Sequence, residues 1–156
     1  EGKAKLGQNV LIVGGTGAAI STALYLLDKG KHTVTMVDKP KKFGLDVNPS
    51  YVWRYMKKLK EGNVVQMLQS TVKEIRDKEV VVEGPDKKEA AIPADTVVLA
   101  NLAPNKEVGY GKYAKDVYMI GDAVQVRRGT AAIRDGYKMG MRVDFFPYQT
   151  YHRIKH

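Results

Sequence analysis

The amino-acid sequence predicts an α/β fold with three layers: a parallel sheet, helices packed against it, and an antiparallel β-meander. Three observations predict this fold. Short apolar runs rich in β-branched residues recur at 9–13, 33–37 and 96–100, as in strands that are buried on both faces. A helical pattern lies between the first two runs, and a second one follows them. Between 71 and 92, short strand-like segments joined by polar turns are typical of hairpins.

The first crossover of the sheet is expected between residues 9 and 37. The strand 9–13 ends in glycine, and a helix follows from about Ala18 to Lys29, where Gly30 is a suitable stop. A second strand, Thr33–Val37, is closed by Asp38. Apolar residues at helical spacing place one buried face on the helix, made of Ile20, Ala23, Leu24 and Leu27.

The second helix begins at a recognisable cap. Asn48 is suited to the N-cap position, Pro49 to the first helical position, and Gly62 to the end of the helix. Its expected buried face consists of Val52, Tyr55, Met56 and Leu59. The elements expected after it are a strand at Val64–Leu68, a hairpin of Thr71–Arg76 with Glu79–Glu83, a short strand near 90–92, strands at 96–100 and 117–120, a helix from about 130 to 143, and a tail at 144–156.

Composition limits the kinds of chemistry. The 156 residues are enough for one domain with a proper core. No apolar run approaches eighteen residues, so we expect no membrane span and a cytoplasmic setting. The sequence contains no cysteine, which excludes disulfides, a redox dithiol, and thiolate-held zinc or iron–sulfur sites within it. Any redox chemistry would therefore need a bound organic cofactor.

The turn between the first strand and the first helix carries the main motif. Dinucleotide-binding turns follow the pattern G-x-G-x-x-G/A, because backbone N–H groups and the helix N-terminus must approach a pyrophosphate. Starting the pattern at Gly15 places Ile20 at its third position, which does not fit. Starting at Gly14 gives Gly14, Thr16 and Ala19, with threonine in place of the central glycine. We therefore expect the pyrophosphate to be held by Gly14, Gly15, Thr16, Gly17 and Ala19.

Thr16 leaves two interpretations of this turn open. Its hydroxyl could donate to a phosphate, or its methyl group could block the phosphate. The alternative to a working site is a structural turn that maintains the fold and has lost its ligand. The formal net charge of +9 is compatible with an anionic ligand or with an ordinary basic surface. Nucleic acid is not favoured, because the lysines are spread along the chain rather than gathered in a stripe.

Asp38 stands where an acid would contact an adenosine ribose. It closes the second strand, 24 residues after Gly14, and an acid at this position accepts ribose hydroxyls and disfavours a 2′-phosphate. Lys39, Lys41 and Lys42 follow it and could instead attract a 2′-phosphate. The acid is the position-specific signal. We therefore expect NAD(H) with Asp38 and Lys39 at the site, and NADP(H) stays open.

Beyond this motif the sequence resembles a known family. The segments that carry the resemblance are 10–15, 22–26, 47–49, 94–100 and 117–123, the last reading Val-Tyr-Met-Ile-Gly-Asp-Ala. They resemble, in the same order, the C-terminal flavoprotein region of the NADH:flavin oxidoreductases. That family includes 2-enoate reductase, 2,4-dienoyl-CoA reductase and, more distantly, trimethylamine dehydrogenase. The resemblance covers roughly residues 9–143.

The resemblance implies a role for each part of the chain. Residues 1–143 would form an NAD(P)/FAD-type dinucleotide-binding domain of Rossmann-like fold, in which 117–143 resembles the closing segment of an FAD domain. Gly121 and Asp122 would then approach the flavin in a partial FAD site. The sequence departs from the family at Thr16 and in the run 101–105. The family's FAD glycine loop, flavin-bearing barrel and cysteine cluster are not found in these 156 residues.

We therefore expect a nucleotide-binding domain of a flavin- and NAD(P)H-dependent oxidoreductase. It would bind NAD(H) for hydride or electron transfer to flavin, with no catalytic residue or metal site of its own. Its partner would be the remainder of a larger flavoenzyme or another subunit, without which it would not be active. The alternative is a degenerate, non-catalytic domain of the same fold that serves assembly or partner binding.

Overall fold

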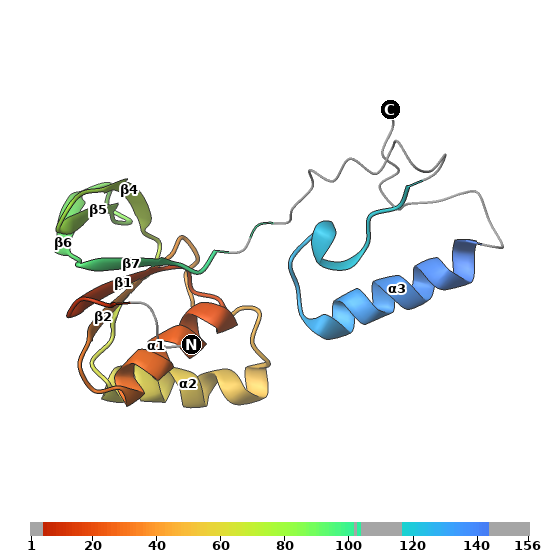
Figure 1. Cartoon of the computed structure of the whole chain (residues 1–156), viewed down its shortest axis with the longest axis horizontal. Helices are drawn as coiled ribbons and strands as arrows, with labels where there is room; N and C mark the ends of the chain where they lie inside the picture. The colour runs from red at the N-terminus through yellow and green to blue at the C-terminus, as the bar shows by residue number, and fades with distance from the viewer. Residues whose placement is uncertain (1–4, 102, 104–116, 144–156) are drawn as a thin grey trace. The chain divides into compact units, whose positions relative to one another are not determined.

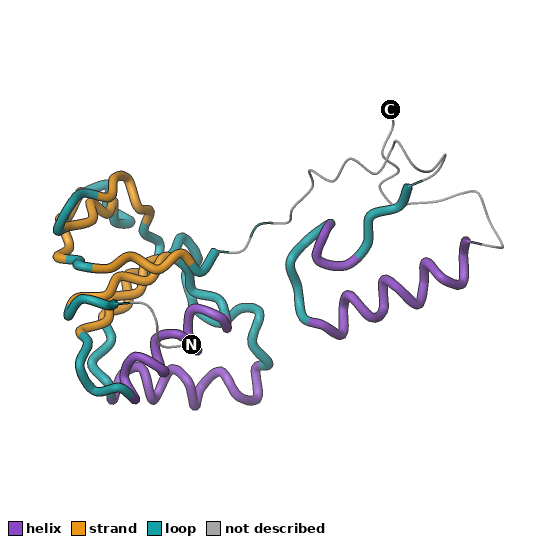
Figure 2. Tube along the Cα trace, in the orientation of Figure 1, coloured by secondary structure: helices purple, strands orange, loops and turns teal. Residues whose placement is uncertain are grey.

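The computed structural model describes residues 5–101, 103 and 117–143, which belong to two compact units. Unit 1 comprises residues 1–101 and unit 2 comprises residues 102–156. All the described strands lie in unit 1, and the described part of unit 2 is helical with connecting loops (Figures 1 and 2). Residues 102 and 104–116, and the whole tail expected at 144–156, lie outside the described residues.

Unit 1 is built on a four-stranded parallel sheet. Its strands are β1 (Asn9–Val13), β2 (Thr33–Val37), β3 (Val65–Met67) and β7 (Thr96–Leu99), in the order β3-β2-β1-β7. Val10 is paired with Val34 on one side of β1 and with Thr96 on the other. β1 is therefore a central strand, paired with β2 along one edge and with β7 along the other.

Two helices connect the first three strands. α1 (Gly17–Asp28) follows β1 and has Thr16 as its N-cap, whereas α2 (Pro49–Glu61) follows β2. The backbone N–H of Ser50 donates to Asn48 Oδ1 at 3.0 Å, and α2 ends before Gly62. The cap, the first helical proline and the terminal glycine of α2 are thus confirmed.

Three antiparallel strands complete unit 1. They are β4 (Thr71–Ile75), β5 (Glu79–Glu83) and β6 (Glu89–Pro93), in the order β4-β5-β6. Val81 pairs with Ala91, and a bulge between Val72 and Glu74 interrupts the pairing of β4 with β5. The predicted hairpin and the short strand after it are confirmed.

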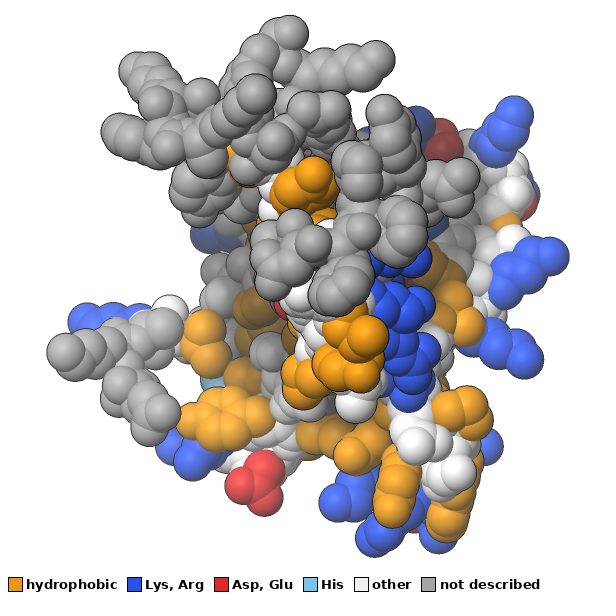
Figure 3. Space-filling view, turned by 90° about the vertical axis from the view of Figure 1, so that its right-hand side faces the viewer, with side chains coloured by type: hydrophobic (Ala, Val, Ile, Leu, Met, Phe, Trp, Pro, Cys, Tyr) orange, Lys and Arg blue, Asp and Glu red, His pale blue; other side chains and the backbone are white. Residues whose placement is uncertain are grey.

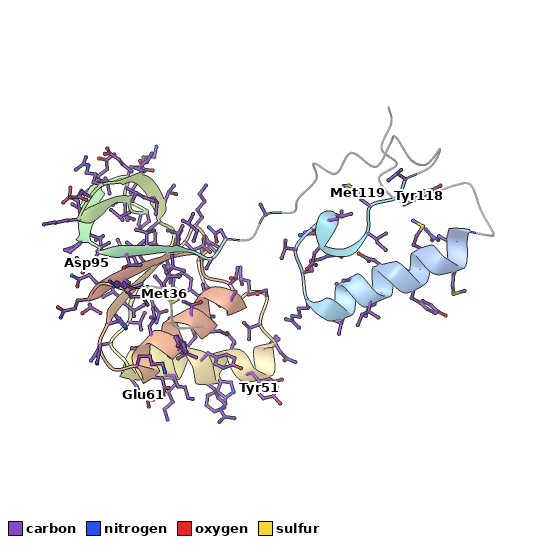
Figure 4. The ribbon with its side chains drawn as sticks, viewed as in Figure 1. Met36, Tyr51, Glu61, Asp95, Tyr118 and Met119 are labelled. Carbon is purple, nitrogen blue, oxygen red and sulfur yellow. The ribbon has the colours of Figure 1, made fainter. Side chains whose placement is uncertain are left out.

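The alternation of side chains along β1 produces the three layers. Val10 and Ile12 belong to a cluster that includes Ile20 of α1 and Leu59 of α2. Leu11 belongs to a second cluster, with Val80 and Val82 of β5 and Val37 and Ala94. Because neighbouring strand residues point to opposite faces, the parallel sheet packs on helices with one face and on the meander with the other. Met36 lies on the helical side, between the sheet and the helices in Figure 4. The predicted three-layer α/β fold is confirmed.

Unit 2 contains a short 3₁₀ helix, η2 (Gly121–Ala123), and the helix α3 (Gly129–Val143). Gly121 has a φ of +61°, and its N–H donates to Asp135 Oδ2 at 3.3 Å, which ties the turn to α3. The same carboxylate forms an ion pair with the guanidinium of Arg127. Apolar side chains at helical spacing are exposed on α3, with exposed fractions of 73% for Ile133, 68% for Tyr137 and 59% for Met141.

Two sequence-based expectations about these elements are wrong. Residues 117–120 were expected to form a strand, but they contain only an isolated bridge at Tyr118. A buried strand needs neighbouring strands to satisfy its N–H and C=O groups, and the described part of unit 2 contains none. Tyr55 was expected on the buried face of α2 but is 37% exposed, because α2 packs through a narrower stripe of Val52, Met56 and Leu59.

The surface carries many cations. Among the side chains coloured in Figure 3, Lys and Arg are numerous and acidic groups are few. No helix among the described residues is long and apolar enough to cross a membrane.

Candidate nucleotide-binding site

The site lies at the carboxyl edge of the parallel sheet. β1 is followed by the glycine turn 14–16, β2 by Asp38, and β7 by Ala100 and Asn101. The chain leaves β1 toward β2 through α1, whereas β7 lies on the other side of β1. Open α/β sheets bind ligands at such a switch point in strand order, outside the carboxyl ends of the strands.

Gly14 makes the sharp turn out of β1. Its φ is +128°, in a region that side-chain-bearing residues rarely adopt, and its N–H donates to the carbonyl of Val37 at 2.8 Å. A Cβ at Gly14 would lie 2.6 Å from Asn101 Oδ1 and 3.1 Å from the carbonyl carbon of Ala100. Glycine is therefore required here by the backbone conformation and by the close approach of the chain after β7.

Gly15 is held between Asp38 and Phe43. Its N–H donates to Asp38 Oδ2 at 2.7 Å. The ring of Phe43 is only 5% exposed and packs beneath the turn, where Cδ1 would lie 2.2 Å from a Cβ at Gly15. The packing of Phe43 thus explains glycine at this position without reference to any ligand.

Thr16 uses its hydroxyl within the protein. Oγ1 donates to the carbonyl of Ala100 at 3.3 Å and accepts from the N–H of Ala19 at 3.4 Å as the N-cap of α1. Thr16 thereby links the start of α1 to the end of β7. Ala19 itself is fully buried in the helical cluster, so its contribution to the turn is its small size and its backbone.

Gly17 contacts Asp46, an acidic residue that the sequence analysis did not identify. Its N–H, the first of α1, lies 2.9 Å from Oδ1 and 3.0 Å from Oδ2 of Asp46. Asp46 is exposed and is 29 residues away along the chain, in the loop between β2 and α2. No motif marks this residue, because the contact depends on how that loop folds back over the turn.

Asp38 directs its carboxylate toward the turn. Oδ2 accepts from Gly15, and Oδ1 accepts from the N–H of Lys39 at 2.8 Å. Asp38 is half-buried, and Lys39, Lys41 and Lys42 are exposed. The turn residues Gly14, Gly15 and Thr16 and the acid Asp38 are thus brought together at one edge of the sheet.

Gly121 and Asp122 belong to unit 2. Gly121 is buried, and Asp122 is exposed and accepts a hydrogen bond from the N–H of Arg127 at 3.2 Å through Oδ1. The described residues contain no cluster of His, Asp and Glu side chains able to hold a metal ion.

The turn offers the elements that a dinucleotide requires, with one obstruction. A helix N-terminus at the carboxyl edge of a parallel sheet attracts phosphate through free N–H groups and the helix dipole. The half-buried carboxylate of Asp38, after β2, lies beside this turn. The obstruction is Asp46, because a carboxylate already occupies the N–H of Gly17.

Comparisons with known proteins agree with this fold. A curated relative, described as a metal reductase of Desulforamulus reducens, is 28% identical in an alignment 172 positions long that includes 90% of this chain and 26% of the reductase. The solved structure of 2-naphthoyl-CoA reductase in complex with 2-naphthoyl-CoA is 37% identical, with a TM-score of 0.73 over 91% of this chain and 22% of that one. Histamine dehydrogenase from Rhizobium sp. 4-9 shares the fold, with 18% identity, a TM-score of 0.73, and coverage of 96% of this chain and 26% of that one.

The chain thus spans about a quarter of the length of each of these relatives. Residues 2–112 match the family described as pyridine nucleotide-disulphide oxidoreductase. This match includes β1, the glycine turn, α1, Asp38 and every strand of both sheets. The chain belongs to the pyridine nucleotide-disulphide oxidoreductase family.

Proposed function

We propose that unit 1 binds NAD(H) and presents it to a flavin elsewhere in a larger enzyme of the NADH:flavin oxidoreductase type. The observation that carries this proposal is the position of the glycine turn at the switch point between β1 and β7, with Asp38 aimed at it. The 37% identity with 2-naphthoyl-CoA reductase supports a relationship closer than a shared fold.

Each residue of the turn has a proposed part in holding the dinucleotide. The backbone of 14–17 and the start of α1 would approach the pyrophosphate, with Ala19 allowing α1 to pack closely on the sheet. The carboxylate of Asp38 would accept the adenosine ribose hydroxyls, while Lys39 would lie at the exposed edge. NAD(H), when bound, would supply the hydride. The residues named here would bind and orient it, and none of them would transfer a proton.

Calorimetric titration with NADH, NADPH and ADP, each to millimolar concentration, tests the proposal. We expect NADH to bind more tightly than NADPH, because the carboxylate of Asp38 repels a 2′-phosphate. Asp38→Asn keeps an oxygen that can accept from Gly15 and removes the charge, so it should bring the two affinities closer together. Asp38→Ala should weaken NADH more than nicotinamide mononucleotide, which has no adenosine ribose. Absence of binding by all three ligands would contradict the proposal.

We further propose that Gly121 and Asp122 reach toward the FAD of the same enzyme. Because a single glycine-turn fingerprint is found in the sequence, the isolated chain should hold no stoichiometric flavin. Its absorbance spectrum should lack flavin bands, and it should not reduce dyes with NADH. A yellow protein with steady turnover would contradict this part of the proposal.

A non-catalytic role in assembly is the second candidate. The observation that favours it is that Gly14 and Gly15 are required by contacts with Asn101 and Phe43, so the turn would persist without a ligand. The titrations above separate the two candidates.

A further inference from the structure

Asp46 places a negative charge where a phosphate would bind. Gly17 is the first residue of α1, and both carboxylate oxygens of Asp46 lie within 3.0 Å of its N–H. The N-terminus of a helix carries a partial positive charge, which stabilises an anion there. In this structure that anion is a side chain of the same chain.

The loop that carries Asp46 is fixed against the turn. The N–H of Gly44 donates to the carbonyl of Gly15 at 2.6 Å, and Gly44 has a φ of +71°. The N–H of Val47 then donates to the carbonyl of Gly44 at 2.9 Å. Phe43 is buried in the helical cluster and packs against Gly15, and Val47 packs against the same cluster. The position of Asp46 over Gly17 is therefore built into the fold of the loop.

From this arrangement we propose that Asp46 is an affinity-determining residue of the nucleotide site, acting as an internal competitor for the pyrophosphate. The inference rests on the proposed function, since it assumes that the turn binds a dinucleotide. A carboxylate and a phosphate have the same sign of charge and need the same N–H, so they cannot occupy it together. Binding of the dinucleotide requires the carboxylate to leave, and its exposed position allows it to turn into water.

The proposal and a purely structural role of Asp46 predict the same change in stability but different changes in nucleotide affinity. Removing the charge of Asp46 takes a favourable anion from the N-terminus of α1, so it should lower stability under either interpretation. A role confined to stabilising the loop and the helix predicts no gain in nucleotide affinity, whereas an internal competitor predicts tighter nucleotide binding in the same variant. We expect affinity to rise about fivefold to tenfold, as for a charge-assisted hydrogen bond in an exposed site.

The experiment is calorimetric titration of the full 156-residue chain with ADP and with NADH. The variants are Asp46→Asn and Asp46→Ser, which both keep an uncharged acceptor near Gly17. The matched control is Asp77→Asn, which removes the same charge from the exposed β4–β5 turn. The variants at 46 should bind both ligands about fivefold to tenfold more tightly than the unaltered chain, and the control should stay within about twofold. Circular dichroism verifies that each variant is folded.

The outcomes separate this inference from the proposed function. Unchanged or weaker binding by folded variants at 46, when the unaltered chain binds NADH, would overturn the inference and leave the proposed function standing. Absence of binding by every folded protein would overturn both. Binding by the variants at 46 alone would support the inference, because the carboxylate would then block the turn, and would contradict the proposed binding of NAD(H) by the unaltered chain.

Discussion

Each unit of the chain contains a turn with a positive-φ glycine, and N–H groups of each turn donate to a carboxylate. The two turns differ in the contacts that hold them in place. The turn at Gly14 joins a central buried strand to a buried helix face, with clusters on both sides of the sheet. The turn at Gly121 is tied to α3 mainly through Asp135, and much of the apolar surface of α3 is exposed. The comparison teaches that similar local geometry can rest on a packed core or, among the residues described, mainly on polar contacts.

The largest expected difference between the units is in the cost of removing apolar side chains. Leu11→Ala should lower the free energy of unfolding by about 2–5 kcal/mol, because Leu11 is fully buried between the sheet and the meander. Ile133→Ala should change it by less than about 0.5 kcal/mol, since that side chain is 73% exposed. Urea unfolding followed by circular dichroism measures both. Equal losses of unfolding free energy would mean that the side chain of Ile133 is buried in solution, which would contradict the difference between the two units.

The two glycines provide the next test. Gly14→Ala should cost about 1–3 kcal/mol from backbone strain at a φ of +128°, increased by its contact with Ala100. Gly121→Ala should cost about 1 kcal/mol, because +61° is a left-handed conformation that alanine can adopt and its Cβ would lie 3.2 Å from that of Ala132. Thermal unfolding of both variants gives the ranking. A larger loss for Gly121→Ala would reverse the comparison.

The sequence predicted unit 1 well because its signals are local and agree with one another. The glycine turn, the cap at Asn48 and the apolar strands each specify their own element, and together they leave few possible topologies. The position of Asp38 beside the turn could be predicted because Asp38 follows a predicted strand, 24 residues after Gly14. These features depend on residues close together in the chain or on the regular geometry of parallel sheets.

Other features could not be predicted because they depend on tertiary contacts. In the sequence, Asp46 is an acid in a loop like many others, and only the fold of that loop places its carboxylate against the N–H of Gly17. Phe43 likewise gave no sign that it packs under Gly15. The prediction of a strand at 117–120 was wrong although the local sequence pattern is that of a strand. The described part of unit 2 contains no strand with which it could pair.

Thr16 tests whether the turn of unit 1 is shaped for its ligand or for its own packing. Thr16→Gly should raise dinucleotide affinity a few-fold by removing a side chain from the phosphate path, and should cost a few tenths of a kcal/mol through loss of the cap. Thr16→Ser is the matched variant, because it keeps the hydroxyl and removes the methyl group. Titration with NADH measures both. Lower affinity in the glycine variant alone would make the hydroxyl a phosphate ligand.

The smallest expected change in stability comes from breaking an exposed ion pair of the meander. The ion pairs there are more exposed to water than the Arg127–Asp135 pair of unit 2. Lys73 Nζ lies 2.8 Å from Glu83 Oε2, and the two side chains are 45% and 30% exposed, against 35% and 20% for Arg127 and Asp135. The hydrogen bond to Glu83 raises the pKa of Lys73 above 10.5. A raised lysine pKa stabilises the fold below pH 10.5, and this contribution is lost as pH rises through the pKa of the folded state.

Lys73→Gln should therefore shift the unfolding midpoint only slightly at pH 7, and 1 M salt should abolish that shift. The difference between the variant and the unaltered chain should be constant from pH 6 to about pH 9 and should vanish at higher pH, where Lys73 is neutral in both the folded and unfolded states. Asp135→Asn should lower the stability of unit 2 more, because it weakens the contacts with both Gly121 and Arg127. Urea unfolding across this pH range measures both variants. A larger, salt-resistant effect at Lys73 would mean that the meander depends on its surface charges as unit 2 depends on Asp135.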